Sequence, residues 1–276
     1  YYPLDFNLAS PYKKIPDAGW WKRLRSEWRD LVDPDQLALR VAEIERLIAH
    51  LEVLTGKRLE IGALSESLRL LNEQMDLVQG AMDAIATAPK CPVTLQDQLA
   101  MYQAMWHRGT VRGRDFAQAF HDETIERVAA GAQAYEVENY RLLYWSGDHE
   151  PRFHPYLREQ HGAVFVANLY SASAQLYARD FDPADPLPAL CGRNIFLVAH
   201  ETPEWMLELA HRFRCDGIVV RERIYPRMSL DGLAAGEAGI PFLSVPHLND
   251  GDDIRPILDA FIRDEVAPYA AARRAG

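Results

Sequence analysis

The sequence has few cysteines, no long apolar run and no concentrated basic segment. Its three cysteines, Cys91, Cys191 and Cys215, include no C-x-x-C pair, which excludes a disulfide framework and a zinc knuckle. Its apolar runs stay below the roughly 18 residues of a membrane span. Thirty basic residues stand against 40 acidic ones, a net charge of −10, which argues against broad affinity for nucleic acid. We therefore expect a soluble, cytoplasmic protein that binds neither membranes nor nucleic acid.

What remains is an ordinary globular composition, with 48% apolar and 25% charged residues in 276. At about 150 residues per domain this length allows two domains or one long α/β domain. Residues 2–6 are typical of a strand that ends in a loop, but no partner strand is near in sequence. Either this strand joins a later sheet, or residues 1–18 end an upstream domain; the first residue, Tyr1 rather than Met, favours the second interpretation.

Residues 19–137 have the pattern of a helical segment. Asp33 and Pro34 form a helix start, apolar residues follow at spacings of three and four, and Gly56 stands where a left-handed cap is expected. This pattern predicts an amphipathic helix over residues 35–55.

A more regular stripe follows between Leu64 and Ile85, where apolar residues recur at alternating spacings of four and three. It predicts a helix capped by Ser65 or a near neighbour. Because the stripe is narrow, we expect it to pack against another helix rather than in a wide core. Two further helices are predicted over residues 94–107 and 114–135.

Residues 138–276 change to short apolar runs separated by helical patterns. Five runs predict strands over residues 142–145, 163–166, 195–198, 217–220 and 242–245. Helices are predicted over residues 151–160, 203–213, 230–238 and 253–266. Apolar runs without alternation, spaced by crossover helices, are typical of parallel strands buried on both faces. The predicted fold class is α/β: a helical segment followed by a doubly wound, flavodoxin- or Rossmann-like parallel sheet.

Ligands of an open parallel sheet bind where the strands end, because the loops diverge there and helix N-termini point into the crevice. The loops at these ends are rich in groups that hydrogen-bond or titrate. The candidate binding residues are Trp145, Ser146, His149, Tyr170, Arg221, Arg223 and Tyr225. Arg221 and Arg223 follow a buried strand in an acidic protein, which favours an anionic ligand group such as a phosphate.

Structural interpretations compete at several of these positions. Trp145 is typical of a lid on the core, and His149 and His154 of surface or capping histidines. Thr202, which follows His200 and Glu201, is predicted to cap a helix that starts with Pro203. The acidic residues Asp250, Asp252 and Asp253 fit the first turn of the last helix better than a cation site.

Common catalytic and nucleotide-binding motifs are missing from the sequence. It contains no G-x-G-x-x-G after the first α/β strand, no complete P-loop and no G-x-S-x-G. Cys215 opens a buried strand and Cys191 lies in an apolar turn, so both are expected in the core. Cys91 lies in a loop, where it can be exposed.

Several segments occur in a distinctive order between about residues 20 and 266. They are residues 52–59, a helix with Leu64, Leu68 and Asn72, residues 162–166 with Tyr170, residues 185–187 with Arg193, residues 215–220, residues 239–241, and a final helix with Arg255 and Phe261. In this order the chain resembles the 2-hydroxyacyl-CoA dehydratase and benzoyl-CoA reductase family. The resemblance implies related subunits in pairs, a four-iron four-sulfur cluster beside an acyl-CoA thioester, and an ATP-dependent activator that donates a low-potential electron.

Two departures from the family pattern concern the cluster. The resemblance implies cluster cysteines in an N-terminal α/β domain and in a loop shortly after the strand at residues 217–220. In this chain Pro226 stands where the second cysteine is expected, and proline cannot ligate iron. The N-terminal α/β domain is missing on this interpretation, so we expect the chain to hold no cluster on its own.

Two functional hypotheses follow. In the first, the chain is a subunit of an electron-driven enzyme acting on acyl-CoA, with a related second subunit and an activator or electron-donor protein as partners. It would contribute substrate binding and subunit contacts, and Arg221, Arg223 and Tyr225 would border the thioester pocket. Ring reduction is slightly favoured over dehydration by residues 162–166, Tyr170 and residues 185–187.

In the second hypothesis, the chain is a non-catalytic paralogue that acts as a scaffold or assembly partner. Proline in place of the cluster cysteine at position 226 supports both hypotheses equally. An unrelated flavodoxin-like binder would require flavin to co-purify.

Overall fold

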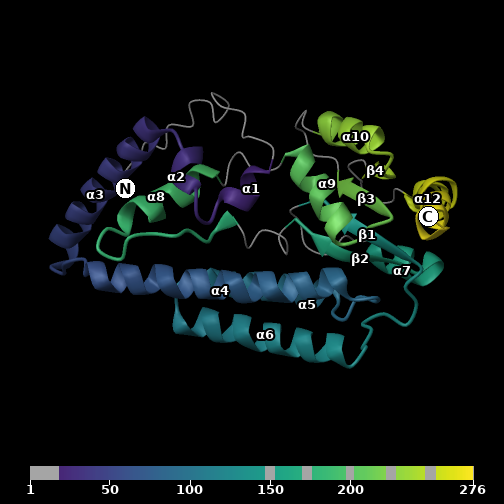
Figure 1. The fold of residues 1–276 in the computed structure, drawn as a ribbon, viewed down its shortest axis with the longest axis horizontal. Coiled ribbons are helices and arrows are strands. Elements are labelled where there is room, and N and C mark those ends of the chain that lie inside the picture. The colour runs from purple at the N-terminus through teal and green to yellow at the C-terminus, as the bar shows by residue number, and fades with distance from the viewer. Residues whose placement is uncertain are drawn as a thin grey trace.

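The protein is described by a computed structural model that is mostly helical and contains a parallel sheet (Figure 1). It describes residues 19–146, 153–169, 176–196, 202–221, 228–245 and 253–275, with the side chains of residues 102–105, 194–196 and 228–229 left out. The predicted strand at residues 2–6 lies outside these ranges. Among the helices of the described ranges, none is long and apolar enough to cross a membrane.

The elements alternate between helices and strands only in the second half of the chain. The helices are α1 (Trp20–Arg23), α2 (Trp28–Leu31), α3 (Pro34–Thr55), α4 (Ile61–Thr87), α5 (Leu95–Ala104), η1 (Met105–His107), α6 (Val111–Ala129), α7 (His154–His161), α8 (Leu187–Phe196), α9 (Pro203–Arg212), α10 (Met228–Glu237), α11 (Arg255–Ala260), the π-helical turn η3 (Phe261–Val266) and α12 (Ala267–Ala275). The strands are β1 (Tyr140–Tyr144), β2 (Ala163–Asn168), β3 (Gly217–Arg221) and β4 (Phe242–Val245).

The first long helix, α3, begins and ends as its sequence predicts. The Asp33 carboxylate accepts the backbone N–H groups of Asp35 and Gln36, at 2.9 and 3.1 Å, which satisfies two of the free donors at the helix start. Gly56 ends the helix with a left-handed φ of 66°. Each of the 22 residues of α3 is at least partly exposed, so capping and one-sided packing on α8 hold this helix in place.

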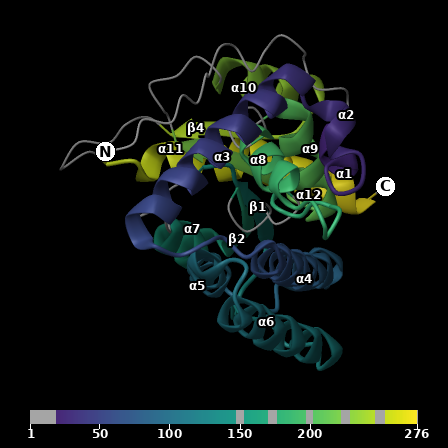
Figure 2. The same cartoon turned by 90° about the vertical axis from the view of Figure 1, so that its left-hand side faces the viewer.

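Helix α4 lies beside α6 at the bottom of both views (Figures 1 and 2). It begins at Ile61, so Ser65 is no cap; the Ser65 hydroxyl donates instead to the Pro183 carbonyl at 2.6 Å. The predicted narrow seam is also wrong, because the stripe joins the largest core cluster together with tryptophans of α1 and α9. A different face of α4, at Gly80, meets His121 of α6. The buried stripe residues are Leu68, Leu71, Met75, Val78, Met82 and Ile85.

The sheet of the described residues has four parallel strands in the order β2-β1-β3-β4, which confirms the predicted α/β class. Tyr144 of β1 lies opposite Asn168 of β2 and Val219 of β3. Side chains of both faces are buried: Leu142 faces a cluster with α5, α7 and α11, and Leu143 faces the cluster with α4 and α9. A sheet that is covered on both faces explains the apolar runs without alternation.

The predicted strand at residues 195–198 is wrong in its described half, because Ile195 and Phe196 form the last turn of α8. Strand β1 pairs directly with β3, so no further strand lies between these two. A run of four apolar residues has no period that separates a strand from the end of a helix. Helix α8 packs on α3 and on Trp28, and its residues Leu187, Ala189 and Cys191 are buried without a sheet. The division at residues 137 and 138 stays a prediction.

Candidate functional site

The carboxyl edge of the sheet contains the topological switch point between β1 and β3, where ligands of open α/β sheets bind. Two of the predicted residues, Trp145 and Ser146, directly follow β1 and are 4% and 2% exposed. The Trp145 backbone N–H donates to the Val219 carbonyl of β3 at 2.9 Å. Arg221, the last residue of β3, lies half-buried at the same edge opposite Val245 of β4. The sheet therefore brings three of the seven predicted residues together.

Three tryptophans close the core beside this edge. The Trp145 ring lies edge-on to Trp205 of α9, with 5.3 Å between ring centroids, and Trp205 lies 6.4 Å from Trp20 of α1. All three rings are at most 4% exposed. This arrangement agrees with the interpretation of Trp145 as a lid on the core, and its role in substrate binding stays a prediction. His149, Tyr170, Arg223, Tyr225 and Pro226 lie outside the described residues.

An arginine cluster that sequence reasoning missed gathers at Tyr177, a residue that follows β2 in the chain. Tyr177, nine positions after the last residue of β2, is covered by the guanidinium of Arg108, 3.9 Å from the ring centroid. The guanidinium of Arg193, from α8, lies 6.0 Å from the same ring. Arg179 completes the cluster and is 3% exposed.

Helix α4 holds this segment in place through a side chain amide. Asn72 accepts the backbone N–H of Arg179 at 3.0 Å and donates to the Arg179 carbonyl at 2.7 Å. Two such bonds fix both backbone groups of the residue, as a neighbouring strand would. An asparagine next to the apolar stripe of α4, at the sequence position after Leu71, was the one local sign of this contact.

The electrostatics of the arginine cluster favour an anionic ligand. Burial, together with the charges of Arg193 and Arg25, lowers the pKa of Arg179 to about 9. Burial also lowers the pKa of Arg193, and the charge of Arg108 adds to this effect. The buried Nε of Arg193 has no hydrogen-bond partner among the described residues. Buried cations that repel one another are stabilised by a bound anion, and guanidinium groups match the geometry of phosphate.

Comparison with known protein families gives a match over most of the chain. The model of the family "2-hydroxyglutaryl-CoA dehydratase, D-component" matches residues 14–245 of the 276. The chain belongs to this family. The match confirms the resemblance seen in the order of the segments and makes the chain a subunit of a 2-hydroxyacyl-CoA dehydratase-type enzyme. No curated protein sequence matches it.

All three cysteines of this chain are buried. Burial raises the pKa of the Cys91 and Cys215 thiols to about 12 and that of Cys191 to about 11. Cluster ligands are thiolates, and burial disfavours this charged form of the three side chains. In the described part of the chain, no three metal-binding side chains come together.

The structure corrects the predicted locations of Cys91 and Cys191. Cys91 is fully buried rather than exposed: its Sγ donates to the Val93 carbonyl at 3.1 Å, and its backbone N–H donates to the Glu138 carboxylate at 2.7 Å. The loop around it is therefore anchored inside the protein. Cys191 lies within α8 rather than in a turn, although it is buried as predicted.

Three further residues considered in the sequence, His154, Thr202 and Asp253, have structural roles. His154 is 1% exposed rather than on the surface; its ring centroid lies 5.0 Å from that of Phe165. The Thr202 hydroxyl accepts the backbone N–H three residues later, at 3.4 Å, which confirms the cap of α9. Asp253 binds the side chain and the backbone N–H of Arg255 at the start of α11. His200, Asp250 and Asp252 lie outside the described residues.

Proposed function

We propose that this chain binds the acyl-CoA substrate of a 2-hydroxyacyl-CoA dehydratase-type enzyme, with the arginine cluster as the site for the CoA phosphates. The observation that carries the proposal is that Arg108 and Arg193 meet over the Tyr177 ring, with the charge of Arg193 acting on the buried Arg179. CoA has a diphosphate and a separate phosphate monoester, which accept charge-assisted, bidentate hydrogen bonds from arginine. The residues proposed for the acyl end are Trp145, Ser146, His149, Tyr170, Arg221, Arg223 and Tyr225.

The proposed reaction removes water from an unactivated position of a 2-hydroxyacyl-CoA, which ordinary acid–base chemistry does not achieve. The resemblance assigns the required electron to a four-iron four-sulfur cluster and to an ATP-dependent activator. Burial of the three cysteines, which disfavours their thiolate form, supports a related second subunit as the holder of that cluster. This chain would then bind and orient the thioester, as a cytoplasmic partner of that subunit.

Contact with a second subunit is supported by the exposed end of α3. Leu51, Val53 and Leu54 in the last turns of this helix are 46%, 84% and 67% exposed, and Leu59 and Ile61 follow at 39% and 44%. Large apolar side chains that gather at one place on a surface are typical of protein contacts. We propose this end of α3 as part of the subunit interface.

Calorimetric titration with CoA and with a 2-hydroxyacyl-CoA tests the proposed phosphate site. Arg193→Gln should weaken the binding of both by about tenfold or more, because charge-assisted hydrogen bonds to the phosphates are lost. Arg193→Lys keeps the charge and should restore part of the affinity. The control is Arg263→Gln, which changes an exposed arginine paired with Asp264 and should bind as the wild type does. Equal affinity of Arg193→Gln and the control would contradict the proposed site.

Turnover by the assembled enzyme distinguishes the roles of the subunit. The second subunit and the activator are assayed anaerobically with ATP, with and without this chain. Loss of 2-hydroxyacyl-CoA dehydration without the chain supports the proposal. Unchanged turnover would instead assign the chain to scaffolding or assembly, and reduction of an aromatic acyl-CoA would assign it to a benzoyl-CoA reductase-like enzyme.

A further inference from the structure

A charged pocket lies at the amino ends of β1 and β3, at the opposite edge of the sheet from the predicted substrate loops. Its volume is about 410 Å³, within the range of about 300–1,000 Å³ of small-molecule sites. Seven of the nine described residues that line it are charged. The cations are Lys90, Arg141, Arg214, Arg273 and Arg274, and the carboxylates are Glu138 and Asp216.

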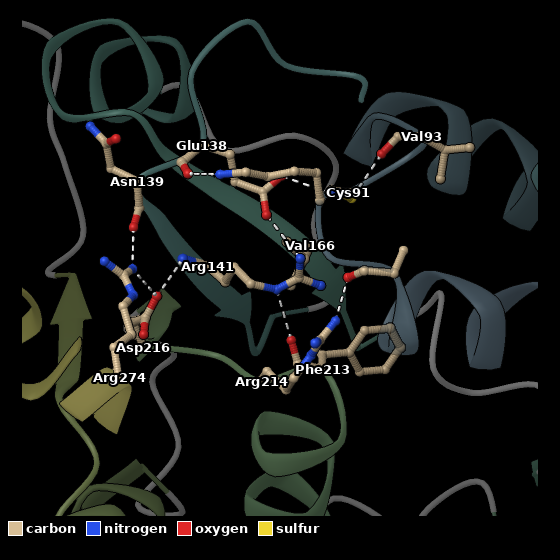
Figure 3. Close-up of polar contacts among 12 residues, drawn as sticks. Cys91, Val93, Glu138, Asn139, Arg141, Val166, Phe213, Arg214, Asp216 and Arg274 are labelled. Atoms are coloured by element: carbon tan, nitrogen blue, oxygen red, sulfur yellow. Dashed lines mark hydrogen bonds and ion pairs between the residues drawn. The ribbon is translucent and has the colours of Figure 1, made fainter. Parts of the chain in front are cut away.

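The two carboxylates are occupied by groups of the protein itself (Figure 3). Glu138 accepts hydrogen bonds from Arg141 Nη1 at 2.8 Å and from the Cys91 backbone N–H at 2.7 Å. Asp216 accepts from Arg273 Nη2 at 2.7 Å and from the Arg141 backbone N–H at 2.9 Å. Five cations against two carboxylates leave the described pocket with a formal charge of 5 − 2 = +3, in a chain whose net charge is −10.

Donor groups remain for a ligand. The Arg141 side chain is 8% exposed, and its buried Nη2 has no hydrogen-bond partner among the described residues. Lys90 donates to the Glu138 backbone carbonyl at 2.6 Å, and Arg214 donates to the Ala88 carbonyl. Carbonyl oxygens orient these two cations without neutralising them. Figure 3 draws Arg214 next to Arg141, and the charge of Arg141 acts on the Arg214 guanidinium, so the two cations are close enough to repel each other.

The backbone of Arg214 gives an independent sign that its side chain is needed there. Arg214 has a φ of +52°, and it is the one non-glycine residue with positive φ in the described part of the chain. It follows the end of α9, where a left-handed residue is usually glycine, because a Cβ is strained in this conformation. Burial and the charges of Arg141 and Arg273 lower the pKa of Arg214. An arginine is thus kept at a position that costs conformational and electrostatic energy.

We propose that this pocket binds a small anion of the diphosphate class, such as inorganic pyrophosphate or the diphosphate group of a nucleotide. Three negative charges would balance the excess of +3, and two adjacent phosphates would engage the paired guanidinium groups. Strands of five residues, at about 3.3 Å per residue, separate this pocket from the carboxyl edge by about 16 Å. The site is therefore distinct from the predicted substrate loops and does not depend on the proposed function.

Calorimetric titration of the full chain with inorganic pyrophosphate, in phosphate-free buffer of low salt, tests this inference. The wild type should bind pyrophosphate, and Arg214→Gly should weaken the binding by about tenfold or more, as expected for a lost charge-assisted contact. Because glycine accepts positive φ, the variant should keep the thermal midpoint of the wild type. Lys90→Gln should weaken binding in the same direction, and Arg263→Gln should have no effect. No binding to the wild type, or equal binding by Arg214→Gly, would overturn the proposal.

Further titrations identify the source of the diphosphate. ADP, CoA and orthophosphate are each tested for competition with pyrophosphate. Competition by ADP supports a nucleotide, and competition by CoA that is weakened by Arg214→Gly supports the CoA diphosphate. Arg193→Gln should leave pyrophosphate binding unchanged, which separates this pocket from the arginine cluster. Binding of an acidic peptide but of no phosphate compound would overturn the proposal and assign the pocket to a protein contact.

Discussion

The ion pair between Glu138 and Arg141 gives the sharpest prediction on stability. The two side chains are 2% and 8% exposed, with 2.8 Å between Oε1 and Nη1. Glu138→Ala removes the carboxylate and leaves the Arg141 guanidinium buried beside other cations of the pocket. The same substitution leaves the Cys91 backbone N–H without its acceptor. Glu138→Ala therefore leaves a buried charge and a buried backbone N–H without their acceptor.

The expected loss follows from these contacts. Removing one partner of a buried ion pair costs about 3–5 kcal/mol, because the remaining charge is uncompensated. Glu138→Gln keeps the shape and an amide oxygen as an acceptor, so it should cost about 1.5–3 kcal/mol, the usual contribution of a hydrogen bond to a charged group. Against a total stability of about 5–15 kcal/mol for a folded domain, Glu138→Ala should remove a large fraction of the free energy of unfolding.

Urea unfolding in phosphate-free buffer measures both variants against the wild type. The control is Glu66→Ala, which breaks an ion pair with Arg69 whose side chains are 53% and 55% exposed; its unfolding midpoint should stay near that of the wild type. The order expected is wild type and Glu66→Ala, then Glu138→Gln, then Glu138→Ala. If Glu138→Ala unfolds at the midpoint of Glu66→Ala, the buried pair does not stabilise the fold and the reasoning is refuted.

Two further predictions concern the thiols and a packed glycine. The thiols of Cys91 and Cys215 have a folded pKa of about 12 and an unfolded pKa of about 8.5. Their contribution is complete below pH 8.5 and is lost toward pH 12, by about 1.4 kcal/mol per pH unit and thiol. The urea midpoint of Cys215→Ala should then fall less steeply between pH 8.5 and 9.5 than that of the wild type; parallel slopes would contradict this. At Gly192 a Cβ would come 2.4 Å from Trp28, so Gly192→Ala should lower the free energy of unfolding by about 1–3 kcal/mol. Gly236→Ala, in open space on α10, is its matched control and should not destabilise; equal losses would exclude the clash.

Local sequence patterns predicted the four strands of the sheet and the buried face of α4. The apolar runs at β1, β2 and β3 have no alternation because helices cover both faces of the sheet there. The carboxyl edge with Trp145 and Arg221 followed from the parallel order alone. The stripe of α4 indicated which face is buried but not what covers it, so the wide core was missed. Ile195 and Phe196 were misassigned because four apolar residues fit a helix end and a strand equally well.

The arginine cluster and the charged pocket could not be predicted because they depend on tertiary structure. Arg108 and Arg193 are 85 positions apart and meet only across Tyr177. In the pocket, Lys90 precedes β1 and Arg273 stands near the end of α12, so no sequence window contains both. A net charge of −10 hides such sites, since it averages over the whole surface. Only the fold concentrates the positive charges.

The long helix α3 has a consequence for the dynamics of the isolated chain. None of its 22 described residues is buried, so its opening exposes little additional apolar surface. Helices of this kind open locally, without the rest of the domain, whereas α4 opens only with the main core. Amide hydrogens of α3 should therefore exchange with solvent well before those of α4. In a cell, proteases would therefore reach α3 of an unassembled subunit before they reach α4.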